Sequence, residues 1–182
     1  MTKSKNILIT GGAGFIGAHV VRRFVTNYTD YHIYNLDALT YAGNLENLTD
    51  IEAKDNYSFL HGDITDQAYI NTIFKQYKPH FCINTAAYTA VDKAETEAEK
   101  AFEINATGAK NLAQVCNDHD AILIHVSTDF VFDGEKNEPY TETDAANPIS
   151  VYGASKLKGE QHIVDTWNKH FIIRTSWLYS QY

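Results

Sequence analysis

The sequence contains few of the residues that mark disulfide-rich or metal-binding proteins. Only two cysteines, Cys82 and Cys116, occur among its 182 residues, and two cysteines make no disulfide framework. Both fall in predicted regular elements and their spacing matches no metal motif, so we expect reduced core residues. The eight histidines are scattered without an H-E-x-x-H pattern. We therefore expect no metal site.

Long apolar runs and basic runs are also missing. The longest apolar runs are short, as in residues 121–124, and no positively charged leader precedes a longer one. We therefore expect neither a membrane span nor a secretory signal, and a cytoplasmic location. Fifteen lysines and arginines stand against 23 aspartates and glutamates, which gives a formal charge of −8. No run of lysines and arginines could form a binding surface for a polyanion, so we expect no nucleic-acid partner.

The most informative stretch lies near the start of the chain. Residues 6–10 have the composition of a buried strand, and Gly11, Gly14 and Gly17 follow in a G-x-x-G-x-x-G array that opens a helical pattern. These glycines would permit a tight turn, the approach of a pyrophosphate to the backbone, and close packing of helix on strand. The helix N-terminus then stabilises the phosphates. The pattern predicts a dinucleotide site.

Two acidic residues are placed to bind the adenosine half of the cofactor. Asp37 ends a strand predicted over 31–37, twenty positions beyond the last glycine of the array. A carboxylate there accepts hydrogen bonds from the ribose hydroxyls and repels a 2′-phosphate, which favours NAD(H) over NADP(H). The alternative is an aspartate that only caps a turn. Asp63, which follows the strand predicted over 57–61, is expected near the adenine amino group.

Strands and helices alternate along the whole chain. This order predicts an α/β fold with a doubly wound parallel sheet of the Rossmann type, as one domain over 1–182 that ends just after the sixth strand. The small side chains of Ala86 and Ala87 would let the backbone pass close to the cofactor. One long helix is expected over 94–116, with Asn105 on its buried stripe tying it to a neighbouring strand. The remaining strands are expected over 80–85, 121–127 and 171–175.

A threonine, a tyrosine and a lysine carry the predicted chemistry. Thr128 ends the fifth strand, and Tyr152 and Lys156 lie four apart at the start of the next helix, on one face. The lysine ammonium would lower the pKa of the phenol and hold the nicotinamide ribose. Thr128 and Tyr152 together would polarise a substrate carbonyl while hydride arrives from the nicotinamide.

These motifs resemble the extended short-chain dehydrogenase/reductase superfamily over essentially the whole chain. Up to about residue 66 the chain is similar to the dTDP-glucose 4,6-dehydratase family, through segments 7–17, 39–48 and 62–64. From about residue 83 onward it is similar to the dTDP-4-dehydrorhamnose reductase family, through the longer motifs 84–95, 127–134, 152–160 and 174–179.

The resemblance implies specific roles at the substrate. Thr128, Tyr152 and Lys156 would be the catalytic residues, and the predicted substrate-binding residues are Thr89, Val91, Thr128, Asp129, Phe130 and Trp177. The reductases often have tyrosine at position 130. The dehydratases have an aspartate and then a glutamate after the threonine, and the glutamate abstracts a proton from the sugar. Phe130 cannot accept a proton, so elimination lacks its base.

The expected cofactor is NAD(H), with NADP(H) as the second candidate. The predicted cofactor-binding residues are Gly11, Gly14, Phe15, Ile16, Gly17, Asp37, Asp63, Ile64, Ala86, Ala87, Tyr152 and Lys156. The expected activity is reduction of a dTDP-linked 4-keto deoxysugar. A dehydratase relative and a non-catalytic NAD-binding module stay open as alternatives, and a homodimer as a candidate assembly. The resemblance also implies that the substrate domain is largely absent from 1–182.

Overall fold

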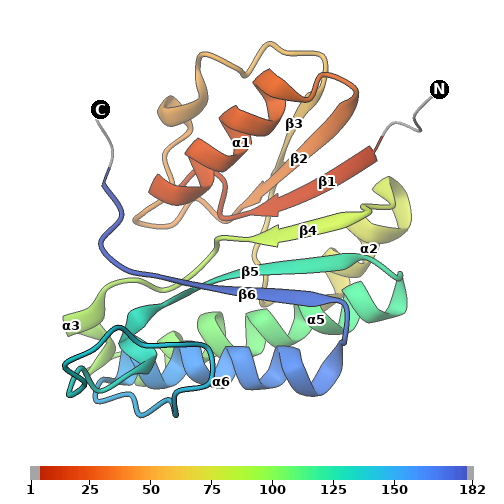
Figure 1. The fold of residues 1–182 in the computed structure, drawn as a ribbon. Coiled ribbons are helices and arrows are strands. Elements are labelled where there is room, and N and C mark those ends of the chain that lie inside the picture. The colour runs from red at the N-terminus through yellow and green to blue at the C-terminus, as the bar shows by residue number, and fades with distance from the viewer. Residues whose placement is uncertain (1–4, 180–182) are drawn as a thin grey trace.

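Six parallel strands form one sheet in the order β3-β2-β1-β4-β5-β6 (Figure 1). The computed structural model describes residues 5–179. The strand order reverses between β1 and β4, so the connections leave these two strands toward opposite sides and open a crevice at their carboxyl ends. The predicted doubly wound parallel sheet is confirmed. The strands are β1 (Lys5–Thr10), β2 (Tyr31–Asp37), β3 (Tyr57–His61), β4 (Phe81–Asn84), β5 (Ile122–Thr128) and β6 (His170–Thr175).

Helices cover both faces of this sheet. Figure 1 shows α1 against β1 and β2 on one face, and α5 and α6 side by side on the other. Alternate residues of β1 serve the two cores: Leu8 packs into the α2, α5 and α6 side, and Ile7 and Ile9 into the α1 side. The helices are α1 (Phe15–Asn27), α2 (Gln67–Tyr77), α3 (Val91–Ala94), α4 (Ala98–Phe102), α5 (Ala109–Asp118) and α6 (Val151–Thr166), with short 3₁₀ turns η1 (Leu45–Leu48) and η3 (Asp129–Val131).

The helix expected over 94–116 is not continuous, so that prediction is wrong. The chain forms α3, leaves helical geometry at residues 95–97, and resumes with α4, a π-helical turn η2 (Glu103–Gly108) and α5. The wide turn carries Asn105, whose side chain binds the backbone of Tyr88 rather than lying free on the helix surface. π-Turns are common where a helix serves a site.

Helix α6 lies directly against this π-turn. A Cβ atom on Gly159 of α6 would lie 2.2 Å from the backbone oxygen of Asn105, so only glycine permits the approach. Asn105 also donates a hydrogen bond to Ser155 Oγ of α6, at 2.9 Å. The predicted tying role of Asn105 is therefore seen in the structure, with a helix as well as the segment after β4 as its partners.

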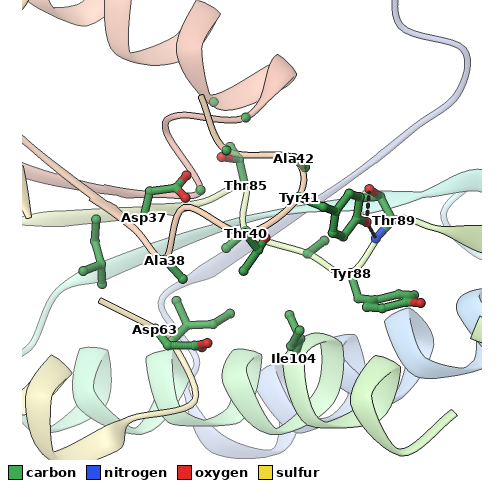
Figure 2. Close-up of a pocket in the computed structure, with 18 of the residues that line it drawn as sticks. Asp37, Ala38, Thr40, Tyr41, Ala42, Asp63, Thr85, Tyr88, Thr89 and Ile104 are labelled. Carbon is green, nitrogen blue, oxygen red and sulfur yellow. Dashed lines mark hydrogen bonds between the residues drawn. The ribbon is translucent and has the colours of Figure 1, made fainter. Parts of the chain in front are cut away.

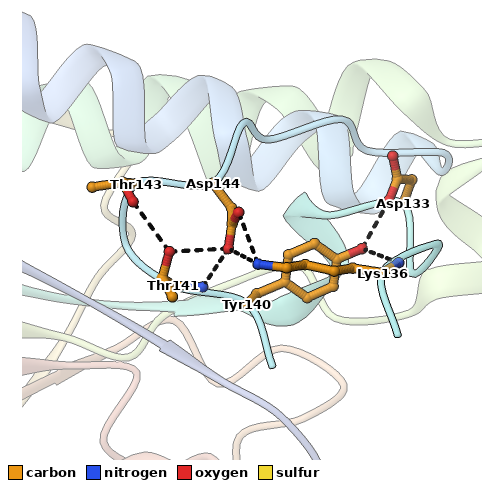
Figure 3. Close-up of polar contacts among 6 residues, drawn as sticks. All are labelled: Asp133, Lys136, Tyr140, Thr141, Thr143 and Asp144. Atoms are coloured by element: carbon orange, nitrogen blue, oxygen red, sulfur yellow. Dashed lines mark hydrogen bonds and ion pairs between the residues drawn. The ribbon is translucent and has the colours of Figure 1, made fainter. Parts of the chain in front are cut away.

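The long connection from η3 to α6 is ordered by polar contacts instead of regular structure (Figure 3). Lys136 donates to both oxygens of Asp144, at 3.0 and 2.8 Å, and this cation lowers the pKa of Asp144 to about 2. Tyr140 donates to Asp133 at 2.8 Å. The connection ends where Ser150 Oγ accepts from Gly153 N and caps α6.

Other expectations about composition can be compared directly with the structure. Cys82 and Cys116 are both buried and unbridged, as expected for core residues. Within residues 5–179, no group of three or more His, Cys, Asp or Glu side chains could hold a metal ion. None of the helices in this described part of the chain is long and apolar enough to cross a membrane.

Candidate active site

A cavity of about 370 Å³ lies at the carboxyl ends of β1, β2 and β4 (Figure 2). All of the predicted cofactor-binding residues except Tyr152 and Lys156 line it. This is the edge of the sheet where the strand order reverses and where open α/β sheets bind their ligands. The further lining residues include Leu36, Ala38, Thr40, Tyr41, Ala42, Gly43, Thr85, Tyr88, Thr89, Lys100 and Ile104.

The glycine array has the geometry that phosphate binding requires. Gly11 adopts φ +73°, a conformation that disfavours side chains, and a Cβ on Gly17 would lie 2.1 Å from the oxygen of Gly11. The turn and the start of α1 therefore pack without side chains between them. Gly14 precedes α1 and offers no side-chain cap, so the first N–H groups of the helix keep their capacity for an anion.

Asp37 lies in the cavity and is already engaged with the backbone. Its Oδ2 accepts from Ala13 N at 2.9 Å, and its Oδ1 accepts from Leu39 N at 2.8 Å. The turn-holding role considered as the alternative is thus present in the structure. A carboxylate accepts about four hydrogen bonds, so the same group keeps capacity for ribose hydroxyls.

Tyr41 joins the two sides of the cavity. Its hydroxyl accepts from Thr89 N at 2.9 Å and lies 2.9 Å from Thr89 Oγ1 (Figure 2). The segment after β2 is thereby linked to the segment after β4. Thr89 is one of the residues predicted to bind substrate, whereas Tyr41 was not predicted, because nothing in the local sequence pattern pairs residues this far apart.

Thr128 and Tyr152 are neighbours beside this cavity, where Tyr152 packs in one cluster with the lining residue Tyr88. Burial raises the pKa of the Tyr152 phenol above its usual value, and the neighbouring hydroxyl of Thr128 has a smaller, opposite effect. The Phe130 ring lies edge-on to the Tyr152 ring with 5.6 Å between centroids. Val91 packs against the same small cluster. The two predicted hydroxyl groups are therefore together.

The polar contacts of the Lys156 amine are with β5 in this structure. Its Nζ donates to the carbonyl oxygen of Val126 at 2.8 Å and lies 3.3 Å from Nε2 of His125. Burial lowers the pKa of Lys156 to about 8. The expectation that Lys156 lowers the pKa of the Tyr152 phenol is wrong here, because the helical spacing fixes the face of α6 but not the side-chain rotamer.

The remaining predicted substrate residues lie on another side of Thr128. Asp129, Phe130 and Trp177 line a second, open hollow of about 1310 Å³ between η3, α6 and β6. Trp177 is 79% exposed there. Asp129 Oδ1 accepts from Thr128 Oγ1 at 3.1 Å. The predicted residues thus fall into two groups that meet at Thr128 and Tyr152.

Comparison with known proteins finds relatives of both kinds implied by the motifs. The profile of the RmlD substrate binding domain matches residues 5–182. The chain is 36% identical over 176 residues to dTDP-4-dehydrorhamnose reductase of Aggregatibacter actinomycetemcomitans, covering 97% of this chain and 52% of that protein. It is 39% identical over 190 residues to dTDP-glucose 4,6-dehydratase of Salmonella typhimurium, covering 93% and 52%. The resemblance to both families is confirmed.

Solved structures similar to this chain also include a reductase and a dehydratase. The dTDP-4-dehydrorhamnose reductase of Bacillus anthracis in complex with NADP has a TM-score of 0.84 at 36% identity, over 100% of this chain and 57% of that one. DesIV, the dTDP-glucose 4,6-dehydratase of Streptomyces venezuelae with NAD and TYD bound, has a TM-score of 0.85 at 33% identity, over 93% and 55%. The chain spans about half the length of the curated relatives it matches.

Proposed function

Since the chain belongs to the RmlD substrate binding domain family, we propose that it binds NAD(P)H and serves reduction of a nucleotide-linked 4-keto deoxysugar. The observation that carries this proposal is the Thr128–Tyr152 hydroxyl pair, which stands next to a cavity with the geometry of a dinucleotide site. A pair of hydroxyl donors beside a hydride carrier is what carbonyl reduction requires. The relatives named dTDP-4-dehydrorhamnose reductase support a dTDP-linked sugar as substrate.

The chain's own residues fit a dinucleotide. The glycine turn and the N-terminus of α1 would hold the pyrophosphate, Asp37 the adenosine ribose, and Asp63 the adenine. Relatives have been solved with NADP and with NAD. We propose that this chain prefers NAD(H), because Asp37 would place a negative charge next to a 2′-phosphate.

Proton transfer would belong to Tyr152. A bound reduced nicotinamide supplies the hydride. Thr128 and Tyr152 would donate hydrogen bonds to the keto oxygen, which draws electron density from the carbonyl carbon. As the oxygen becomes an alkoxide, the phenol of Tyr152 would give it a proton. Burial favours the protonated phenol, so Tyr152 is held in the form that a reduction needs.

A dehydratase is the second candidate, because several similar relatives carry that name. The residue after Asp129 weighs against it. Phe130 is 40% exposed and lies against Tyr152, at the position where the dehydratases carry their glutamate base. A phenyl ring cannot remove a proton from the sugar, so reduction is the chemistry that the site supports best.

The assembly and location remain part of this proposal. We propose that residues 1–182 act as the cofactor-binding domain, in the cytoplasm, with a homodimer as a candidate assembly. Trp177 and the open hollow beside Phe130 would lie on the sugar side of the site. A non-catalytic NAD-binding module is the remaining alternative, and it gives no reason for placing Thr128 beside Tyr152.

The test combines binding and turnover. Fluorescence titration with NADH and NADPH measures cofactor affinity, and a panel of nucleotide-linked 4-keto sugars measures cofactor oxidation. Saturable NADH binding with oxidation that depends on the sugar supports the proposal. If neither cofactor binds, the proposal is overturned. If the cofactor binds but is not oxidised even when the chain is part of a protein with a complete sugar site, the non-catalytic module is favoured.

A further inference from the structure

A buried row of polar side chains leads from β1 across the sheet to Lys156. Asn84 on β4 is its fixed point. Its Oδ1 accepts from the backbone N–H of Ala86 at 3.1 Å and from Thr10 Oγ1 at 2.7 Å. A backbone N–H can only donate. The amide of Asn84 therefore has one orientation, with Nδ2 on the opposite side.

The orientation of Asn84 determines the tautomer of His125. Asn84 Nδ2 lies 2.9 Å from His125 Nδ1, and an amide nitrogen only donates, so Nδ1 must be the acceptor. His125 is 1% exposed, and its burial together with the nearby Lys156 lowers the pKa of the imidazole well below its usual value. A neutral imidazole with an accepting Nδ1 carries its proton on Nε2.

That Nε2–H group faces the amine of Lys156 at 3.3 Å. A neutral amine has a lone pair that accepts this proton, and one of its N–H groups donates to Val126 O at 2.8 Å. An ammonium has no lone pair, so its N–H groups would face the N–H of His125. The surroundings of Lys156 therefore match the neutral amine.

We propose that His125 is a positioning residue for Lys156: fixed as its Nε2–H tautomer by Asn84, it donates to the neutral amine and holds that side chain against β5. When Lys156 takes a proton from solvent, the amine loses the lone pair that made this contact. The ammonium is then released toward Tyr152, which lies on the same face of α6. The role of Lys156 in this scheme rests on the proposed function.

The other charged groups around Lys156 do not remove the preference of this residue for the neutral amine. Glu160 lies one turn later on α6 and favours the ammonium. Its carboxylate is, however, already engaged by Arg174 of β6, with 2.6 Å between Nη2 and Oε2, and by Ser127 of β5. Tyr152 on α6 is protonated at neutral pH. Asp129 of η3 is directed at Thr128. Burial, which disfavours the ammonium, outweighs them.

The scheme predicts that Lys156 changes position with its charge. Without cofactor and above the pKa of Lys156, the side chain stays with His125 and Val126. Below it, the ammonium is available for the phenol of Tyr152 and for the hydroxyls of a bound ribose. A purely structural His125 would fill space beside Lys156 but would not sense the charge of that residue.

Nuclear magnetic resonance of the 182-residue chain without cofactor tests this directly. Long-range ¹H–¹⁵N spectra of ¹⁵N-labelled imidazoles would be recorded from pH 6 to 10. We expect His125 as the neutral Nε2–H tautomer throughout, with its Nε2 signal shifting around a midpoint near pH 8, where Lys156 titrates. An Nδ1–H tautomer, or an imidazolium at pH 7, would overturn the proposal.

Two matched variants assign the shift to its source. Lys156→Met keeps a chain of similar length and should abolish the pH-dependent shift of His125, whereas Lys158→Met, on the exposed side of the same helix, should retain it. A shift that persists in Lys156→Met would contradict the proposal. The wild-type tautomer decides the matter even if that variant does not fold. This experiment measures no turnover, so an unexpected tautomer would not overturn the reductase proposal. Likewise, a failure to bind NADH would not change the tautomer observed for His125.

Discussion

The carboxylate of Asp37, at the end of β2, accepts a hydrogen bond from the backbone N–H of Ala13 in the glycine turn, at 2.9 Å. This contact joins the group expected to bind the ribose with the loop expected to bind the pyrophosphate. The proposed selection of the cofactor and the observed geometry of the loop therefore depend on one side chain. Removing the whole side chain would disturb both, so a gentler change is needed to separate them.

Asp37→Asn is that change. The amide keeps one oxygen acceptor for the backbone but removes the negative charge that would oppose a 2′-phosphate. We expect NADH to bind about tenfold more weakly, because a charge-assisted hydrogen bond to a ribose hydroxyl contributes about 1.5 kcal/mol. NADPH should lose less, so the ratio of the two dissociation constants falls. Titration of both cofactors measures it, and an unchanged ratio would remove Asp37 from cofactor selection.

Substitutions at Gly14 and Gly17 should have different effects, the first on cofactor binding and the second on stability. A Cβ on Gly14 would meet its nearest atom, the oxygen of Gly11, at 3.2 Å, whereas on Gly17 the same oxygen would lie at 2.1 Å. Gly14→Val should therefore fold nearly as the parent does but place its branches in the pyrophosphate path and abolish NADH binding. Gly17→Ala should instead lower the melting temperature. Circular dichroism and titration distinguish the two, and normal binding by Gly14→Val would place the phosphates elsewhere.

The amide of Asn105 should contribute strongly to stability. It is 2% exposed and bonds the N–H and the carbonyl of Tyr88, at 2.8 and 3.0 Å, as well as Ser155. Asn105→Ala leaves these buried groups unpaired and should lower the unfolding free energy by about 2 to 4 kcal/mol. Asn117→Ala, on the exposed surface of α5, should change it by less than about 0.5 kcal/mol. Urea denaturation compares them, and similar losses would contradict the account.

The buried Lys156 should make stability rise with pH. Its pKa of about 8 in the folded chain lies below the usual 10.5, so the unfolded state binds more protons between these values and folding strengthens as pH increases through them. Below pH 8 the penalty is fully present. The unfolding free energy of Lys156→Met minus that of the parent should therefore be larger at pH 7 than at pH 10, by roughly 2 kcal/mol. This follows from about 1.4 kcal/mol for each pH unit of difference in pKa. If the difference in unfolding free energy between the two proteins does not change with pH, the pKa of Lys156 is that of an ordinary lysine.

Local patterns were sufficient for the strands, the glycine turn and the position of Asp37 at the end of β2, because each is defined by residues close in the sequence. The break before α4 and the π-turn at Asn105 were missed, since they depend on contacts with Tyr88 and α6. The orientation of Lys156 was missed for the same reason: its partners are on β5. A polar residue, His125, within an apolar strand was the available signal that something buried required it.

The most direct test of the central claim is the fate of the hydride. The chain would be joined to the carboxyl-terminal half of a dTDP-4-dehydrorhamnose reductase, since it spans about half of such relatives, and assayed beside the chain alone with deuterated NADH. Sugar positioning can lower a barrier by roughly 7–11 kcal/mol, so we expect weak or undetectable turnover from the chain alone. In the joined protein, mass spectrometry should find deuterium at carbon 4 of the reduced sugar, lost in Tyr152→Phe, and no 4-keto-6-deoxy sugar from dTDP-glucose. Clear elimination from dTDP-glucose, or unchanged deuterium transfer in Tyr152→Phe, would contradict the account.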